Sequence, residues 1–153
     1  MPANLVVRDV MTTDVLSFRA ADDVSEAMHA LVDHGVDGAP VVDDDGAVVG
    51  VITTGDLIVK QSRLHFPTVV AILGASFEIK SRHFDDDLDK ALGSKVDDVM
   101  SHPAITVEAD ATVEDAATIM HDERVSRLPV VDSGRLVGIV SRVDVLRGML
   151  SDR

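Results

Sequence analysis

The sequence of 153 residues contains no cysteine, tryptophan or tyrosine, and it has only four phenylalanines. The absence of cysteine excludes disulfide bonds and thiolate metal sites, and it is typical of proteins from reducing compartments. Apolar residues still make up 46% of the chain. The core must therefore be built from valine, isoleucine, leucine, methionine and alanine.

Long hydrophobic runs are also absent. No stretch approaches the ~18 apolar residues that a membrane-spanning helix needs. The first ten residues, MPANLVVRDV, lack the basic and then apolar pattern of a secretory signal. We therefore expect a soluble, cytoplasmic protein that has no membrane partner.

Basic residues are scarce, because 14 lysines and arginines face 27 acidic residues and give a net charge of −13. Such a chain repels polyanions, which argues against a nucleic-acid partner. The charge is unevenly distributed, since residues 124–153 carry six basic and three acidic side chains. This locally basic segment favours a small anionic ligand over a large one.

A short motif lies in the same basic segment, at Gly134–Leu146. The apolar run Leu136–Val140 predicts a buried strand, and Ser141 follows it at the position of a helix N-cap. Asp144 then falls in the first helical turn. Backbone N–H groups at such a strand end can hold a phosphate, and the carboxylate can hold sugar hydroxyls. The same two residues can equally well serve only as a helix cap.

This motif occurs twice, because Gly46–Leu57 repeats it with Thr53 and Asp56. Corresponding residues of the two copies are 89 positions apart before the hairpin turn and 88 positions apart after it. The difference arises because the turn of the first copy is one residue longer. An insertion confined to a turn is typical of a true structural repeat. Two more pairs of segments match at the larger offset: Val10-Met11-Thr12 with Val99-Met100-Ser101, and Ala39–Asp43 with Leu128–Asp132.

Each repeat predicts the element order β-α-β-β-α. The first helix of each repeat is expected to begin with a capping box, Asp23 with Glu26 and Thr112 with Asp115, and Gly35 ends the first of them. Residues 1–9 are expected to form a short turn or strand that packs on the second repeat. The predicted strands are 15–17, 38–42 and 48–53, then 104–106, 128–131 and 136–141; the predicted helices are 24–34, 55 onward, 113 onward and 143–150.

Between the repeats, residues 60–97 form a segment longer than a simple connection. We expect a helical insertion or lid there, with helices at Pro67–Ala75 and Phe84–Leu92. Its three phenylalanines, Phe66, Phe77 and Phe84, could pack on a partner subunit or on the chain's own core. The predicted organisation is thus repeat 1 at 1–59, the insertion at 60–97 and repeat 2 at 98–153.

With both copies aligned, the sequence resembles the cystathionine-β-synthase (CBS) domain family, as a tandem pair known as a Bateman module. The resemblance covers residues 10–57 and 99–147. It implies an α/β (α+β) fold with a pseudo-two-fold axis and two clefts for adenosine-containing ligands. It also implies a homodimer and a regulatory, energy-sensing role, in which ligand binding changes the affinity for an effector protein.

The resemblance further implies which residues bind. Thr53 with Asp56, and Ser141 with Asp144, would hold the ribose and phosphate. Residues 12–15 and 36–40 would line one cleft, and residues 101–104 and 125–129 the other. The residues expected to bind ligand are Thr12, Asp14, Val15, Val36, Gly38, Ala39, Pro40, Thr53, Asp56, Ser101, Pro103, Ala104, Val125, Ser126, Arg127, Pro129, Ser141, Arg142 and Asp144.

The two copies differ at one important place. Asp37 stands where the second copy has Ser126, and Gly38 stands where it has Arg127, a position at which members of the family often place a basic phosphate contact. A carboxylate there repels phosphate unless a metal ion such as Mg²⁺ intervenes. We therefore expect one good nucleotide site that uses Arg127, and a second site that is weak or empty.

The sequence does not indicate an enzyme. The six histidines show no metal-type pairing, and the chain has no glycine-rich phosphate loop or nucleophile elbow. The acidic runs 43–45 and 85–87 do not continue into a calcium-binding loop. We thus expect no catalysis, no metal site and no obligatory cofactor; the expected ligand is an adenine nucleotide (AMP, ADP or ATP) or a related adenosyl metabolite. The alternative is a structural or protein-interaction module whose clefts are vestigial.

Overall fold

The computed structural model describes residues 5–60 and 94–151. The predicted helices at Pro67–Ala75 and Phe84–Leu92, and the three phenylalanines near them, lie outside these ranges. The contacts divide the chain into two compact units, each described here by itself. One unit, called the Asp144 unit, comprises Met1–Leu16, Asp44–Val48 and Ala104–Arg153; the other, called the Asp56 unit, comprises Ser17–Asp43 and Val49–Pro103.

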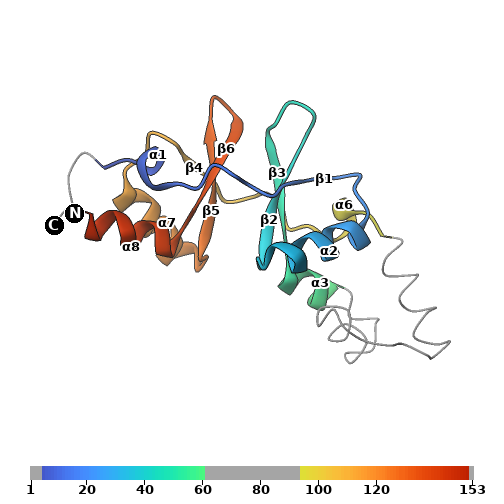
Figure 1. Ribbon diagram of the computed structural model, residues 1–153. Coiled ribbons are helices and arrows are strands. Elements are labelled where there is room, and N and C mark those ends of the chain that lie inside the picture. The colour runs from blue at the N-terminus through green and yellow to red at the C-terminus, as the bar shows by residue number, and fades with distance from the viewer. Residues whose placement is uncertain (1–4, 61–93, 152–153) are drawn as a thin grey trace. The chain divides into compact units, whose positions relative to one another are not determined.

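The Asp56 unit contains a three-stranded sheet in the order β1-β2-β3, in which β1 runs parallel to β2. All five residues of β2 are buried, which makes it the central strand of this core. Helices α2, α3 and α6 complete the unit (Figure 1). The elements are β1 (Phe18–Arg19), α2 (Val24–His34), β2 (Gly38–Val42), β3 (Val48–Thr53), α3 (Thr54–Lys60) and α6 (Val96–Val99).

The Asp144 unit repeats this plan with the sheet order β4-β5-β6. Strand β4 runs parallel to β5, and β5 pairs antiparallel with β6. Its buried core cluster is wholly aliphatic, as the scarcity of aromatic residues requires. Helices α7 and α8 contact each other beside the sheet (Figure 1). The elements are α1 (Val7–Val10), β4 (Val107–Glu108), α7 (Val113–Glu123), β5 (Arg127–Asp132), β6 (Arg135–Ser141) and α8 (Arg142–Leu150).

The predicted β-α-β-β-α order is confirmed in both repeats, but the first strand of each was placed wrongly. The predicted strands were 15–17 and 104–106, whereas the structure forms them at Phe18–Arg19 and Val107–Glu108. Pairing with the central strand selects the residue that can be buried. Phe18 and Val107 are 6% and 4% exposed, whereas Ile105 is 38% exposed.

The segment that precedes each repeat in the sequence packs on the other repeat. In the Asp144 unit, the N–H of Val7 donates to the Ala111 carbonyl at 2.8 Å, so the N-terminal lead-in, residues 5–12, packs on the second repeat as expected. It does so with the short helix α1, however, where a turn or strand was expected. In the Asp56 unit, the N–H of Val24 donates to the Ser94 carbonyl at 2.9 Å. The central lead-in, residues 94–101, therefore packs on the first repeat.

Only one of the two predicted capping boxes forms. The N–H of Asp115 donates to Thr112 Oγ1 at 3.0 Å, and the N–H of Thr112 donates to Asp115 Oδ2 at 3.3 Å. Asp23 occupies the N-cap position of α2, but its carboxylate does not cap the helix. It instead pairs with the Lys95 ammonium group of the central lead-in. No helix in the described parts of the chain is long and apolar enough to cross a membrane.

Candidate functional site

The Ser141 motif lies at the junction of β6 and α8, as the sequence predicts. The N–H of Asp144 donates to Ser141 Oγ at 3.2 Å, and the N–H of Ser141 donates to Asp144 Oδ2 at 2.9 Å. The pair therefore forms a reciprocal cap that fixes both side chains at the start of the helix. The Asp144 side chain is 8% exposed. Its second carboxylate oxygen, Oδ1, takes no part in the cap.

Three arginines surround this helix start. The register of β5 and β6 places Arg127 directly opposite Ser141. The N–H of Arg142 donates to the Ser126 carbonyl at 3.0 Å, which ties the first residue of α8 to the residue before β5. Arg147 Nη1 lies 3.5 Å from Asp144 Oδ1. Positive charge and helix N–H groups thus occur together, an arrangement suited to a phosphate.

Arg147 was missed by the sequence reasoning. Its side chain is 75% exposed and lies one turn after Asp144 on the same helix. Its partner Asp144 is only 8% exposed, so a ligand hydroxyl that binds Asp144 Oδ1 has to displace the Arg147 guanidinium. The i, i+3 spacing was the available signal, because residues three apart on a helix share a face.

The Thr53 motif builds the same cap in the Asp56 unit. The N–H of Asp56 donates to Thr53 Oγ1 at 3.0 Å, and the N–H of Thr53 donates to Asp56 Oδ2 at 3.2 Å. Here the second carboxylate oxygen has a partner, because the Ser101 hydroxyl donates to Asp56 Oδ1 at 2.6 Å. Both oxygens of Asp56 are therefore engaged, and a ligand hydroxyl would have to compete with Ser101.

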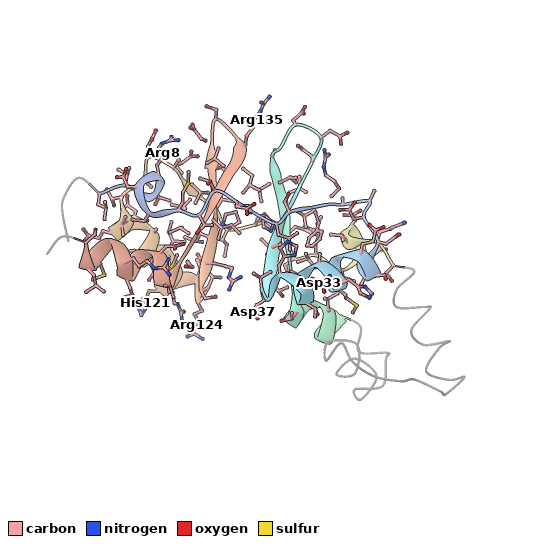
Figure 2. The ribbon with its side chains drawn as sticks, viewed as in Figure 1. Arg8, Asp33, Asp37, His121, Arg124 and Arg135 are labelled. Atoms are coloured by element: carbon pink, nitrogen blue, oxygen red, sulfur yellow. The ribbon has the colours of Figure 1, made fainter. Side chains whose placement is uncertain are left out.

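The position that corresponds to Arg127 is tightly packed in the Asp56 unit, so a side chain there would require its neighbours to move. A Cβ atom built on Gly38 would stand 3.0 Å from the Ile52 carbonyl oxygen and 3.0 Å from Thr53 Cγ2. The preceding residue is the acidic Asp37, which lies at the start of β2 (Figure 2). Its carbonyl accepts the N–H of Thr54 at 2.8 Å, so it holds the place of Ser126. This strand end therefore has Asp37 and Gly38 where the other has Ser126 and Arg127.

Two of the expected cleft residues lie beside a strand that leads into a motif. In the Asp144 unit, Thr12 exchanges backbone hydrogen bonds with Ile139, at 2.8 and 2.9 Å. In the Asp56 unit, Ser101 exchanges them with Val51, at 2.8 and 2.9 Å. The reason is the exchange of lead-ins, which brings each one beside the motif strand of the other repeat.

The remaining expected residues fall into two sets. Those within strands β2 and β5 are buried and serve the core: Gly38, Ala39, Pro40 and Pro129. Those in the connections are exposed or half-buried: Asp14, Val15, Val36, Pro103, Ala104, Val125 and Ser126. Within the described residues, no group of three or more histidine, cysteine or acidic side chains is arranged to hold a metal ion.

Comparison with known proteins agrees with this architecture. The sequence model of the CBS domain family matches residues 7–63 and 96–151. An uncharacterised protein of Methanocaldococcus jannaschii is 32% identical over 95% of this chain and 92% of its own length. The chloroplast protein CBSX1 of Arabidopsis thaliana is 35% identical over 83% of this chain, which spans 56% of that relative.

Solved structures of the same family share the fold. A CBS domain from a membrane protein of Sphaerobacter thermophilus has a TM-score of 0.76 at 29% identity, over 94% of this chain and 87% of that one. CBSX2 of Arabidopsis thaliana, solved in complex with AMP, has a TM-score of 0.73 at 28% identity, over 97% and 98% of the two chains. The expected mixed α/β fold of two repeats is thereby confirmed.

Proposed function

Because this chain belongs to the CBS domain family, we propose that it is a regulatory module that binds an adenine nucleotide in the Asp144 unit. The nucleotide is AMP, ADP or ATP, and its phosphate lies beside Ser141 and Arg127. The observation that carries the proposal is the β5–β6 register, which sets Arg127 opposite Ser141 at the first turn of α8.

The chemistry of this strand end suits a nucleotide at both its phosphate and its ribose. Arg127 and the N–H groups of the first turn of α8 offer positive charge and donors to a phosphate. Asp144 Oδ1 is left out of the cap and offers an acceptor to a ribose hydroxyl. A relative of this chain, CBSX2, has been solved with AMP, which supports a ligand of the same class here.

We propose that the Asp56 unit does not take up the nucleotide with comparable affinity. Asp37 brings a negative charge to the strand end, and Gly38 leaves no arginine there. The Ser101 hydroxyl already occupies Asp56 Oδ1. Repulsion of the phosphate and competition for the carboxylate both weaken binding. One nucleotide per chain is therefore the expected stoichiometry.

The test is calorimetric titration with AMP, ADP and ATP, with NAD, cyclic AMP and S-adenosylmethionine as further arms. Arg127→Gly introduces the residue found at the corresponding position of the first repeat. Asp144→Asn keeps one oxygen to accept the Ser141 N–H but removes the negative charge. We expect the wild-type chain to bind one equivalent of an adenine nucleotide, and each substitution to weaken binding at least tenfold, the equivalent of about 1.4 kcal/mol.

Arg135→Ala is the matched control, because Arg135 is exposed at the opposite end of the same hairpin. It should bind like the wild type, as should Asp56→Asn. A saturating nucleotide should also raise the melting temperature of the wild type, by linkage. Absence of binding by every nucleotide would overturn the proposal. The helix caps would then be purely structural, and a ligand-free interaction module would be the better account.

We also infer that the module is not a catalyst and that it acts by changing the affinity for an effector protein. The family resemblance further leads us to propose a homodimer. Light scattering coupled to size-exclusion chromatography measures this directly, and a mass of 16.3 kDa at all concentrations would contradict it.

A further inference from the structure

Three arginines of the Asp144 unit, called the Ser126 arginines, lie around one residue at the strand end that carries Ser141. They are Arg124 at the end of α7, Arg127 at the start of β5 and Arg142 at the start of α8. Ser126 directly precedes Arg127 and follows Arg124 by two residues. Its carbonyl accepts the N–H of Arg142 at 3.0 Å. Three different elements therefore bring an arginine to the same place.

The Ser126 arginines have no carboxylate partner among the residues that the structure describes. Arg8 and Arg147, by contrast, are both engaged with aspartates of this unit. Two of the Ser126 arginines, Arg124 and Arg142, are exposed, and Arg127 is half-buried. The two acidic residues at the end of α7 form no ion pair with them within the described ranges. Three guanidinium groups are thus available to an anion from outside the chain.

The first repeat has none of these cations. Gly35, Gly38 and Thr54 stand at the positions of Arg124, Arg127 and Arg142. Arg124 also holds a left-handed backbone, with φ of 57°, where its counterpart is the glycine that this conformation favours. A strained residue that is kept in place of glycine points to a use for its side chain. One guanidinium already suits one phosphate, because its fork can donate to two oxygens. The set is therefore larger than a monophosphate requires.

We propose that Arg124 and Arg142 make this site selective for a nucleoside triphosphate over the monophosphate. The inference rests on the nucleotide site proposed above and states which nucleotide that site prefers. Arg127 and Ser141 bind the first phosphate. Arg124 and Arg142 pair with the second and third phosphates, each of which adds negative charge and acceptor oxygens.

A longer polyanion offers the same phosphates, but the charge of the whole chain opposes it. The net charge is −13, and a nucleic-acid strand would extend from the Ser126 arginines over an acidic surface that repels it. A triphosphate is short enough to meet mainly the local positive charge, because distant charges are screened at physiological salt. The ligand is therefore a single nucleotide.

The test is calorimetric titration of the whole chain with AMP, ADP and ATP in EDTA, so that no metal ion masks the phosphates. The wild type should bind ATP at least about tenfold more tightly than AMP, with ADP between them. Arg124→Gly and Arg142→Thr introduce the residues of the first repeat. Each should weaken ATP binding more than AMP binding and lower the ratio of the two affinities at least about threefold. Arg124→Gly should still fold, because glycine tolerates the left-handed backbone.

Arg135→Ala is the matched control, since Arg135 is an exposed arginine at the opposite end of the β5–β6 hairpin. It should leave the ratio of ATP to AMP affinity unchanged. AMP binding as tight as ATP binding would overturn this inference and leave the nucleotide site standing. A preference for ATP that both substitutions preserve would overturn it as well. Absence of binding by all three nucleotides would overturn the site and this inference together.

Discussion

Gly138 and Met11 lie so close that a Cβ atom built on the glycine would stand 2.7 Å from the Met11 sulfur. The same atom would stand 2.8 Å from the backbone carbonyl oxygen of Thr12, which cannot rotate away. Gly138→Ala should therefore push the N-terminal lead-in off β6. We expect a loss of about 1–3 kcal/mol in the free energy of unfolding, as for overpacking in a core, measured by urea denaturation.

The Asp56 unit provides a second instance of the same contact. A Cβ atom on Gly50 would stand 2.7 Å from the Met100 sulfur and 2.9 Å from the Ser101 carbonyl oxygen. Gly50→Ala should lower the free energy of unfolding by a similar amount. Gly55→Ala is the control, since its nearest contact is Thr53 Oγ1 at 3.5 Å, an ordinary distance. A Gly138→Ala chain as stable as the wild type would mean that the lead-in does not hold this position in solution.

The helices that correspond in the two repeats, α2 and α7, end in the same left-handed conformation with different residues. Gly35 has φ of 64° and Arg124 has φ of 57°. An arginine is strained there and a glycine is not. Arg124→Gly should therefore raise the free energy of unfolding by up to about 1 kcal/mol, and Gly35→Ala should lower it by a similar amount. Thermal unfolding of the two variants measures both effects.

The presence of an arginine at position 124 also bears on function. It lies at the end of α7, close before the start of β5 (Figure 2). A strained residue that is retained at a strand end is a candidate for a functional role. If the Arg124 side chain contributes to the positive charge near the nucleotide, Arg124→Gly should weaken AMP binding while it stabilises the fold. A variant that is less stable than the wild type would contradict the strain argument.

Much of the fold could be predicted because the central strands are short apolar runs bounded by turn residues. The run Gly38–Val42 is wholly buried, as predicted. The first strand of each repeat could not be placed so well, because each is two residues long and is selected by its partner strand. Pairing with Val41 or Val130 is a tertiary event that local sequence does not encode.

The candidate site was predicted in its residue types but not in its partners. Ser141 and Asp144 follow from the repeated motif, and the choice of Arg127 follows from the family resemblance. The contact of Ser101 with Asp56 spans 45 residues, and no periodicity predicts it. The sequence did hold a clue to the packing of the lead-ins. Each lead-in has a methionine followed by a hydroxyl residue, Met11-Thr12 and Met100-Ser101, and each is packed against a glycine of a third strand, Gly138 and Gly50.

The two predicted capping boxes lead to a matched pair of substitutions. Thr112 accepts the Asp115 N–H and caps α7, whereas the Asp23 carboxylate pairs with Lys95. Thr112→Ala should cost about 1 kcal/mol of stability, the usual effect of losing a cap. Asp23→Ala should cost clearly less, because an exposed ion pair contributes little. Equal losses in chemical denaturation would contradict the observed difference between the two helix starts.

Arg8 joins two carboxylates of the Asp144 unit, and this contact makes stability depend on pH. Its guanidinium donates to Asp132 Oδ2 at 2.9 Å and to Asp110 Oδ1 at 3.1 Å. The hydrogen bond from Arg8, and then its charge, hold the pKa of Asp132 below its usual value of 3.8. A carboxyl whose pKa is lower in the folded state stabilises the fold above its unfolded pKa, and this contribution is lost as the pH falls through the folded pKa.

Arg8→Met should therefore lower the melting temperature at pH 7, and the difference from the wild type should shrink as the pH falls below about 4. The same two carboxylates raise the pKa of Arg8 itself, so its own titration has no effect in this range. All three side chains are exposed, so 1 M salt should reduce the difference at pH 7. Arg8→Lys should recover part of it, because lysine keeps the charge but lacks the planar fork. A difference that is constant from pH 7 to pH 2.5 would instead assign the effect to packing of the aliphatic stem of Arg8.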